Sequence, residues 1–339
     1  MKIKKYVFYA LFFLFLIFAT YFFVFKKYSL EELINSLQYC NPLYIVLGIL
    51  AMFSWAFFES LYLKRLLGKL GYKVPWYNAF GYVATETYFS AITPSSMGGQ
   101  PVMMMEMSRD GIPYRVNSVV ILLNTLIYKI ALLTLATIGF ILYKDILLSF
   151  GGWFYWLVVL GYLTTVLVVI LFIVLVYSKR VMYILLKASL WLMKKVHYKN
   201  AEAKEKELNE VIKEYQDVAD FTRRHPGVLV ESYFILLMQR LSILVVSYFI
   251  YCSFGLHEHS VLLLIAFQAC VCLGSDFMPF PGGVVVSENL LLLANEYLYG
   301  RSLAASGMVL LRSISFYGVV ILSIIIYLLF HFRKKDEVK

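Results

Sequence analysis

Three basic side chains lie within long apolar stretches of this sequence, where a charge is costly to bury. They are Lys129, Arg240 and Arg312. A charge at the centre of a membrane helix costs about 2.5 to 3.5 kcal/mol on insertion scales, and such residues usually face a protein interior, a partner charge or a water-filled path. Basic side chains and helix N-termini are common ligands of phosphate groups. We therefore expect the three cations to form a receptor for an anionic group.

Carboxylates accompany these cations in neighbouring segments. They are Glu86, Glu106, Asp276 and Glu288. In one interpretation, Glu106 and Glu288 balance the cations of an empty site or bind an amine on the ligand. In the other, the charges form internal salt bridges that only hold the helices together. Arg312 would then pair with Glu288. Lys129 would pair with Glu106. The sequence leaves both interpretations open.

Two Pro/Gly-rich kinks interrupt the apolar stretches at corresponding places in the two halves of the chain. The first kink is Thr93–Pro101 (TPSSMGGQP) and the second is Met278–Gly283 (MPFPGG). Backbone that leaves a helix cannot face lipid, so at membrane depth it must be buried in protein or line a polar cavity. Paired interruptions of this kind recur in the substrate sites of transporters. We therefore expect the ligand to bind between the two kinks.

The composition decides the class of protein that carries these residues. Of the 339 residues, 61% are hydrophobic and 15% are charged, and the mean hydropathy is +0.75. Soluble domains carry about 25% charged residues. The sequence therefore predicts an all-α polytopic membrane protein, with one membrane domain over residues 1–339.

The apolar runs predict six full transmembrane helices and two shorter hairpins. The spans are expected at about 6–25, 43–63, 116–143, 153–177, 227–253 and 302–331, because each approaches or exceeds the ~20 residues that cross a bilayer. Bulky residues at the end of the first run argue against a cleavable signal peptide. Four shorter segments, about 76–92, 97–108, 261–275 and 283–298, are read as the arms of re-entrant hairpins over 76–110 and 261–299.

Lysine and arginine in the loops predict the orientation. Basic residues follow the span 43–63, fill the segment 178–226 and follow the last span, and basic loops are typically cytoplasmic. Both termini are therefore expected in the cytoplasm of a prokaryote, with the chain in its cytoplasmic membrane. The two hairpins then enter from opposite faces, which predicts an inverted-topology repeat of about 43–143 and 227–331. The segment 178–226 is predicted to form amphipathic cytoplasmic helices.

The sequence offers no evidence for a cofactor. It contains no P-loop, no H-E-x-x-H and no G-x-S-x-G pattern. His257 and His259 are near neighbours, but they lack further metal-ligand spacing. The four cysteines have no C-x-x-C spacing and are expected to pack. We expect neither a metal nor a cofactor nor a nucleic acid as ligand, and no ATP-driven pump.

The two kinks and the order of spans around them resemble a known family. The Thr-Pro-x-x-x-Gly-Gly-Gln-Pro block of the first kink and the Pro-x-Pro-Gly-Gly-x-x-x-x-Glu block at Pro279–Glu288 are similar to the lysylphosphatidylglycerol synthase transmembrane region, or flippase-like domain. The resemblance covers nearly the whole chain and implies a helical membrane domain that moves lipid across the bilayer. The matching motif positions are Gly98, Gly99, Gln100, Pro281, Gly282, Gly283 and Glu288.

The chain also departs from the family pattern. Val285 stands where many members have another glycine, so the second hairpin is expected to be less open or less closely packed. No polar segment is long enough for an aminoacyl-tRNA transferase fold. We therefore do not expect an enzyme, and a lysyltransferase activity would not follow from the resemblance.

The favoured function is a lipid flippase or scramblase that works by alternating access. Its substrate would be an aminoacyl phospholipid, a glycolipid or a polyprenyl phosphate, and its partners a second copy of the chain or a separate lipid synthase. One alternative is a membrane enzyme or an accessory synthase subunit with Glu288 or Asp276 as general base. Another is an anchor that holds a synthase through residues 178–226.

Overall fold

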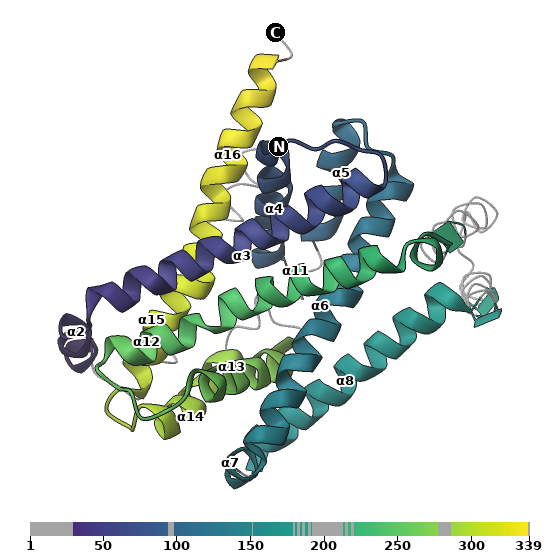
Figure 1. Ribbon diagram of the computed structural model, residues 1–339. Helices are drawn as coiled ribbons and strands as arrows, with labels where there is room; N and C mark the ends of the chain where they lie inside the picture. The colour runs from purple at the N-terminus through teal and green to yellow at the C-terminus, as the bar shows by residue number, and fades with distance from the viewer. Residues whose placement is uncertain are drawn as a thin grey trace.

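A computed structural model describes residues 30–93, 98–150, 152–178, 220–276 and 286–337, together with separate positions between 180 and 217. These residues form helices joined by short loops, and no strand occurs among them (Figure 1). The predicted all-α fold is therefore confirmed for the described part of the chain. Most of the segment 178–226 lies outside the described residues, and with it the predicted amphipathic helices.

Long apolar helices form the frame of the bundle. They are α3 (Pro42–Lys69), α6 (Tyr114–Leu142), α8 (Gly152–Tyr177), α11 (Pro226–Leu244) continued by α12 (Val246–Ser253), and α15 (Ala304–Arg312) continued through the π-helical η3 (Ser313–Gly318) into α16 (Val319–Glu337). In the described residues, five such helices are long and apolar enough to cross a membrane. The chain is thus a multi-pass membrane protein. The predicted span 6–25 lies outside the described residues.

Two pairs of shorter helices lie between these long ones. They are α4 (Trp76–Ala91) with α5 (Gly99–Arg109), and α13 (Val261–Asp276) with α14 (Val286–Leu298); α2 (Leu30–Gln38) and α7 (Lys144–Ser149) are short helices next to long ones. At 1.5 Å per residue, a 16-residue helix is about 24 Å long, shorter than the ~30 Å hydrocarbon core. The members of each pair pack on one another. Their connections are the two predicted kinks, of which residues 94–97 and 277–285 lie outside the described residues.

The two pairs of short helices occupy opposite ends of the bundle. Helix α14 packs on α15, where the Asn295 side chain donates to the carbonyl of Ala304 at 3.1 Å. Helix α4 instead packs on α16, where the Tyr77 hydroxyl donates to the carbonyl of Leu329 at 2.7 Å. Figure 1 shows α4 and α5 near the C-terminal part of the yellow helix and α13 and α14 near its start. One long helix therefore contacts both pairs, each with a different half.

A polar layer separates two hydrophobic cores. The first core includes Met52, Val246, Ile250, Leu264 and Met308, and the second includes Tyr62, Leu66, Tyr82, Leu236 and Phe330. On α3, the buried Glu59 lies in sequence between Met52 of the first core and Tyr62 of the second. Gln239 occupies the corresponding place on α11. The long helices therefore carry their buried polar residues at the level where the two cores meet.

Candidate functional site

Lys129 lies near the middle of α6 and forms an ion pair with the last residue of α13. Its Nζ donates to Asp276 Oδ2 at 2.8 Å, and the Tyr128 hydroxyl donates to the same oxygen at 3.1 Å. A cation at the C-terminal end of a helix also interacts favourably with the helix dipole. The predicted pairing of Lys129 with Glu106 is wrong, because Asp276, 147 residues later in the chain, takes that place.

Arg240 approaches the same place from α11. Its guanidinium carbon lies 3.7 Å from the centroid of the Tyr128 ring, a cation–π contact. Its Nε is buried and has no hydrogen-bond partner among the described residues. A buried donor is nearly always hydrogen-bonded in a native protein, so this one is available to a ligand or to water.

Arg312 closes the site from α15. It donates to the Ser287 hydroxyl, and its Nε lies 3.9 Å from Glu288 Oε1, so the predicted pairing of Arg312 with Glu288 is confirmed. Both side chains are nearly buried, at 11% and 2% exposure. Ser287 and Glu288 stand in the first turn of α14, directly after the second kink. Arg312 therefore contacts the first turn of α14.

The three cations converge around the end of α13. Cys272, one turn before Asp276, interacts electrostatically with Lys129, Arg240 and Arg312. The three come from different long helices, α6, α11 and α15, and are far apart in sequence. The structure thus brings together the three basic residues that the sequence singled out; we call Lys129, Arg240 and Arg312 the cation site.

The start of α5 contacts α6 close to the end of α13. Gln100, in the first turn of α5, donates through Nε2 to the Thr125 hydroxyl at 3.0 Å. Thr125 and Lys129 are four residues apart and therefore share one face of α6. Gln100, which follows the glycines of the first kink, and Asp276, the last residue of α13, thus contact α6 one helical turn apart.

Two glycines allow the first kink to fold closely against α4. A Cβ atom on Gly99 would overlap the Ser90 hydroxyl and the backbone carbonyl of Glu86, so only glycine lets α5 begin there. The backbone N–H of Gly98 donates to the Thr93 hydroxyl at 2.9 Å. The close approach explains the glycine pair physically. Pro281, Gly282 and Gly283 of the second kink lie outside the described residues.

The structure places Glu106 in a different cluster from the cation site. The residue is 3% exposed and lies near the end of α5. It accepts a hydrogen bond from Arg109 Nη1 at 2.5 Å, and His331 Nε2 of α16 lies 3.7 Å from the same oxygen. Glu106 therefore pairs with Arg109 near the end of α5 and lies close to His331 of α16 instead of pairing with Lys129.

Several buried polar residues of the layer were not singled out from the sequence. Glu59 and Asn124 are each 7% exposed, and the Asn124 amide donates to Glu59 Oε1 at 2.7 Å. Gln239 is 1% exposed. Each is an isolated polar residue in an apolar span, which is itself a signal, because such residues are costly in a membrane unless they are partnered. The candidate site is consequently larger than the three cations.

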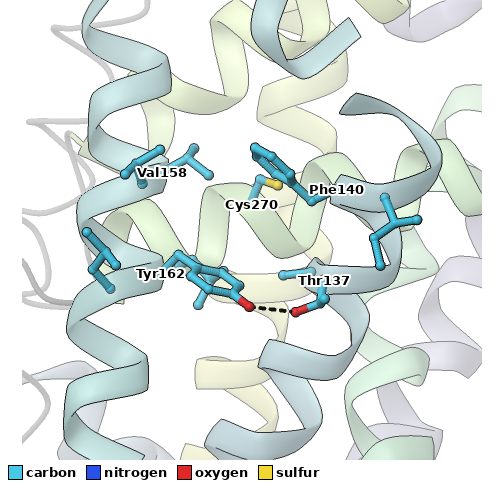
Figure 2. Close-up of a pocket in the computed structure, with 10 residues that line it drawn as sticks. Thr137, Phe140, Val158, Tyr162 and Cys270 are labelled. Atoms are coloured by element: carbon cyan, nitrogen blue, oxygen red, sulfur yellow. Dashed lines mark hydrogen bonds between the residues drawn. The ribbon is translucent and has the colours of Figure 1, made fainter. Parts of the chain in front are cut away.

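An apolar cavity of about 260 Å³ lies beside this site (Figure 2). Residues of α6, α8 and α13 line it, and Figure 2 shows Phe140, Val158 and Cys270 around it. The hydroxyls of Thr137 and Tyr162 are hydrogen-bonded to each other at 2.9 Å. Ile141 and Leu163, which are exposed, also line it, so the cavity opens on the apolar outside of the bundle. Such a space suits a hydrocarbon chain.

Comparisons with known proteins agree with this architecture. The chain is similar to a UPF0104 membrane protein of Archaeoglobus fulgidus, with 28% identity over 97 residues. The matched stretch covers 28% of this chain and 30% of that protein, so the similarity is limited to one segment of each. Residues 6–323 match the family described as the lysylphosphatidylglycerol synthase TM region. That match spans nearly the whole sequence, and the chain belongs to the lysylphosphatidylglycerol synthase transmembrane region family.

Proposed function

We propose that the protein moves a phospholipid or lipid-linked headgroup across the membrane and that the cation site holds its phosphate. The observation that carries this proposal is the contact of Lys129 with Asp276 and of Arg240 with Tyr128 at the end of α13, with Arg312 electrostatically near the same helix end, within an apolar bundle. Lys129 and Arg312 each form an ion pair with a carboxylate, whereas the buried Nε of Arg240 has no hydrogen-bond partner within the described part of the chain. A phosphate would supply acceptors for it.

The ends of the short helices support the same assignment. Helix α5 begins at Gly99, within the first kink, and α14 begins at Val286, three residues after the second kink. The N-terminus of a helix presents free backbone N–H groups and partial positive charge, which favour a phosphate. In this proposal Gly98, Gly99, Gln100 and the kink residues Pro281, Gly282 and Gly283 surround the headgroup. Asp276 and Glu288 keep the cations neutralised while the site is empty.

We further propose that the two short pairs are re-entrant hairpins of an inverted repeat. Their lengths and their positions at opposite ends of the bundle support this arrangement. The repeats would cover about 43–143 and 227–331, and rocking of one against the other would expose the headgroup to each leaflet in turn. The basic loops support cytoplasmic termini and the cytoplasmic membrane as location.

The apolar cavity supports a route for the lipid tail. Leu273, which lines the cavity, stands on α13 one turn before Asp276 of the ion pair with Lys129. One helix therefore connects the charged site with a space of about 260 Å³ that opens on the outside. In the proposed complex an acyl chain lies in this cavity while the phosphate contacts the cations.

The enzymatic alternative receives less support from the geometry. Asp276 accepts hydrogen bonds from both Lys129 and Tyr128, and Glu288 pairs with Arg312. Both carboxylates already have basic partners within the chain, as structural charges do. We therefore assign the protein transport without catalysis, with any synthase as a separate partner.

Translocation by the purified full chain in liposomes tests the proposal. Fluorescent anionic and aminoacylated phospholipids in the inner leaflet become sensitive to an impermeant reductant when they reach the outer one. Wild type should move lipid, and Arg240→Gln and Lys129→Gln should slow it at least tenfold. Arg65→Gln is the matched control, because Arg65 is 62% exposed and pairs only loosely, at 3.8 Å, with Glu231. Absence of movement by wild type for every lipid, or equal rates in all variants, would overturn the proposal.

A further inference from the structure

Two carboxylates that interact with Arg240 have no part in the proposed phosphate site. They are Glu59 of α3 and Glu86 of α4. Asn124 donates to Glu59 at 2.7 Å, and the Gln239 side chain also hydrogen-bonds to Glu59. Gln100, the residue after the glycines of the first kink, hydrogen-bonds to Glu86. Both carboxylates therefore belong to the polar layer between the cores.

The two carboxylates share one cation. They repel each other, and the guanidinium of Arg240 attracts both. Tyr62 of α3 also interacts electrostatically with both glutamates, but its hydroxyl already donates to the carbonyl of Val120 at 3.0 Å. No further cation among the described residues acts on either glutamate. Two like charges in a buried site cannot both stay ionised cheaply.

The charge balance of the polar layer also indicates that Glu59 and Glu86 are not both ionised. Among the described residues, the three cations have four carboxylate neighbours: Asp276 pairs with Lys129, Glu288 pairs with Arg312, and Glu59 and Glu86 both interact with Arg240. Asp276 and Glu288 each have their own cation, so the excess negative charge falls on the other two. The kink residues 94–97 and 277–285 contain no ionisable side chain that could compensate. One bound proton would make the layer neutral.

Gln239 offers a buried acceptor that a proton on the carboxylate pair would satisfy. Its side chain is 1% exposed and reaches Glu59, yet its Oε1 is buried without a hydrogen-bond donor in the described residues. An amide oxygen in such a place requires a donor. The hydroxyl of a protonated carboxyl group would satisfy it, whereas two ionised carboxylates would not.

We propose that Glu59 and Glu86 share one exchangeable proton and that this proton moves together with the anionic lipid. When a phosphate binds Arg240, the guanidinium is drawn away from the glutamates, and the pair then retains its proton more tightly. Release of the phosphate returns Arg240 to the pair, and the proton leaves to water on the same side. The step is a proton transfer between water and a carboxylate oxygen, and it breaks no other bond. The coupling rests on the proposed function, whereas the shared proton does not.

Infrared spectroscopy of the purified full chain tests the shared proton without any transport. Wild type near neutral pH should show the C=O stretching band of a buried protonated carboxyl group. Glu86→Gln and Glu59→Gln should each remove or shift it. Glu231→Gln should leave it unchanged, because Glu231 is partly exposed on the same helix as Gln239. A wild-type spectrum without the band, or a band that survives both substitutions, would overturn the proposal.

Transport in liposomes tests the coupling. An acidic outer bath should raise the rate at which anionic lipid moves inward at least threefold, with acidification of a trapped pH dye. Glu86→Gln should still move lipid, with no response to the gradient. If lipid moves at equal rates with and without the gradient, the coupling is wrong and the proposed function stands. If the rate follows sodium instead of pH, the pair binds a metal cation and the proton is wrong. If no lipid moves at all, the proposed function fails, and the infrared result still decides the shared proton.

Discussion

Gly161 of α8 lies directly against the backbone carbonyl of Leu273 on α13. A Cβ atom at this position would overlap the carbonyl oxygen, so the two helices cross with no side chain between them. Small residues at helix crossings are the usual means of close packing in membranes, where apolar burial between helices gives little driving force. Leu273 also lines the apolar cavity. The crossing of α8 and α13 therefore forms part of the wall against which a lipid tail would lie.

Gly161→Val is expected to separate α8 from α13. Overpacking of a close crossing typically costs about 1 to 3 kcal/mol, which should lower the thermal unfolding temperature in detergent by several degrees. Gly68→Ala is the control, because Gly68 of α3 has open space where a Cβ would lie and alanine favours a helix. Equal unfolding temperatures for Gly161→Val and wild type would show that the helices do not touch here.

The ion pair of Lys129 and Asp276 predicts a strong coupling between two sites 147 residues apart. Asp276→Asn or Lys129→Met alone leaves a partly buried charge without its partner and should cost on the order of 1 to 3 kcal/mol, below the cost for fully buried pairs. The double variant should recover much of that loss in thermal stability. Strictly additive losses in the double-mutant cycle would contradict the pair.

Filling the cavity should affect lipids according to their tails. Val158→Trp places a large ring in a space of about 260 Å³ and is expected to slow the movement of long-chain lipids several-fold. A short-chain analogue with the same headgroup should be less affected, because its phosphate site is intact. Leu167→Trp on the exposed face of α8 is the matched control. Equal slowing of both lipids would place the tail elsewhere.

The proposed orientation predicts which loops are accessible from each side. Arg115, at the start of α6, and Arg301, in the loop before α15, are both exposed. With the four native cysteines replaced, Arg115→Cys should react with an impermeant maleimide only from the cytoplasmic side. Arg301→Cys should react only from the outside. Labelling of both from one side would refute the inverted arrangement of the two hairpins.

The helix pattern could be predicted from the sequence, because in a membrane it depends on local properties. Apolar length defines the long helices, and proline and glycine end the short ones, as α4 and α5 show around the first kink. The span 302–331 was predicted as one continuous helix, and the structure adds the π-helical η3 within it. The sequence contains no proline at that point that would have signalled a change.

The pairing of charges could not be predicted to the same extent. Glu106 and Asp276 are both acidic residues near a kink, and only tertiary packing decides that Asp276 meets Lys129. Arg312 and Glu288 were easier, because they belong to adjacent segments of the same half. No sequence motif marks Glu59, because it lies in a span with no kink, far from the motifs. Its role depends on Arg240 and Glu86, which come from other helices.

The π-helical turn after Arg312 rotates the side chains of α16 around the helix axis relative to those of α15. Each extra residue in a helical turn shifts all later side chains around the axis, by about 100° relative to a regular α-helix. The half before η3 thereby directs Arg312 toward Ser287, while the half after it directs Phe330 toward Tyr82. Removal of a single residue from η3 would restore one regular phase, and the helix could then match only one of its two neighbours.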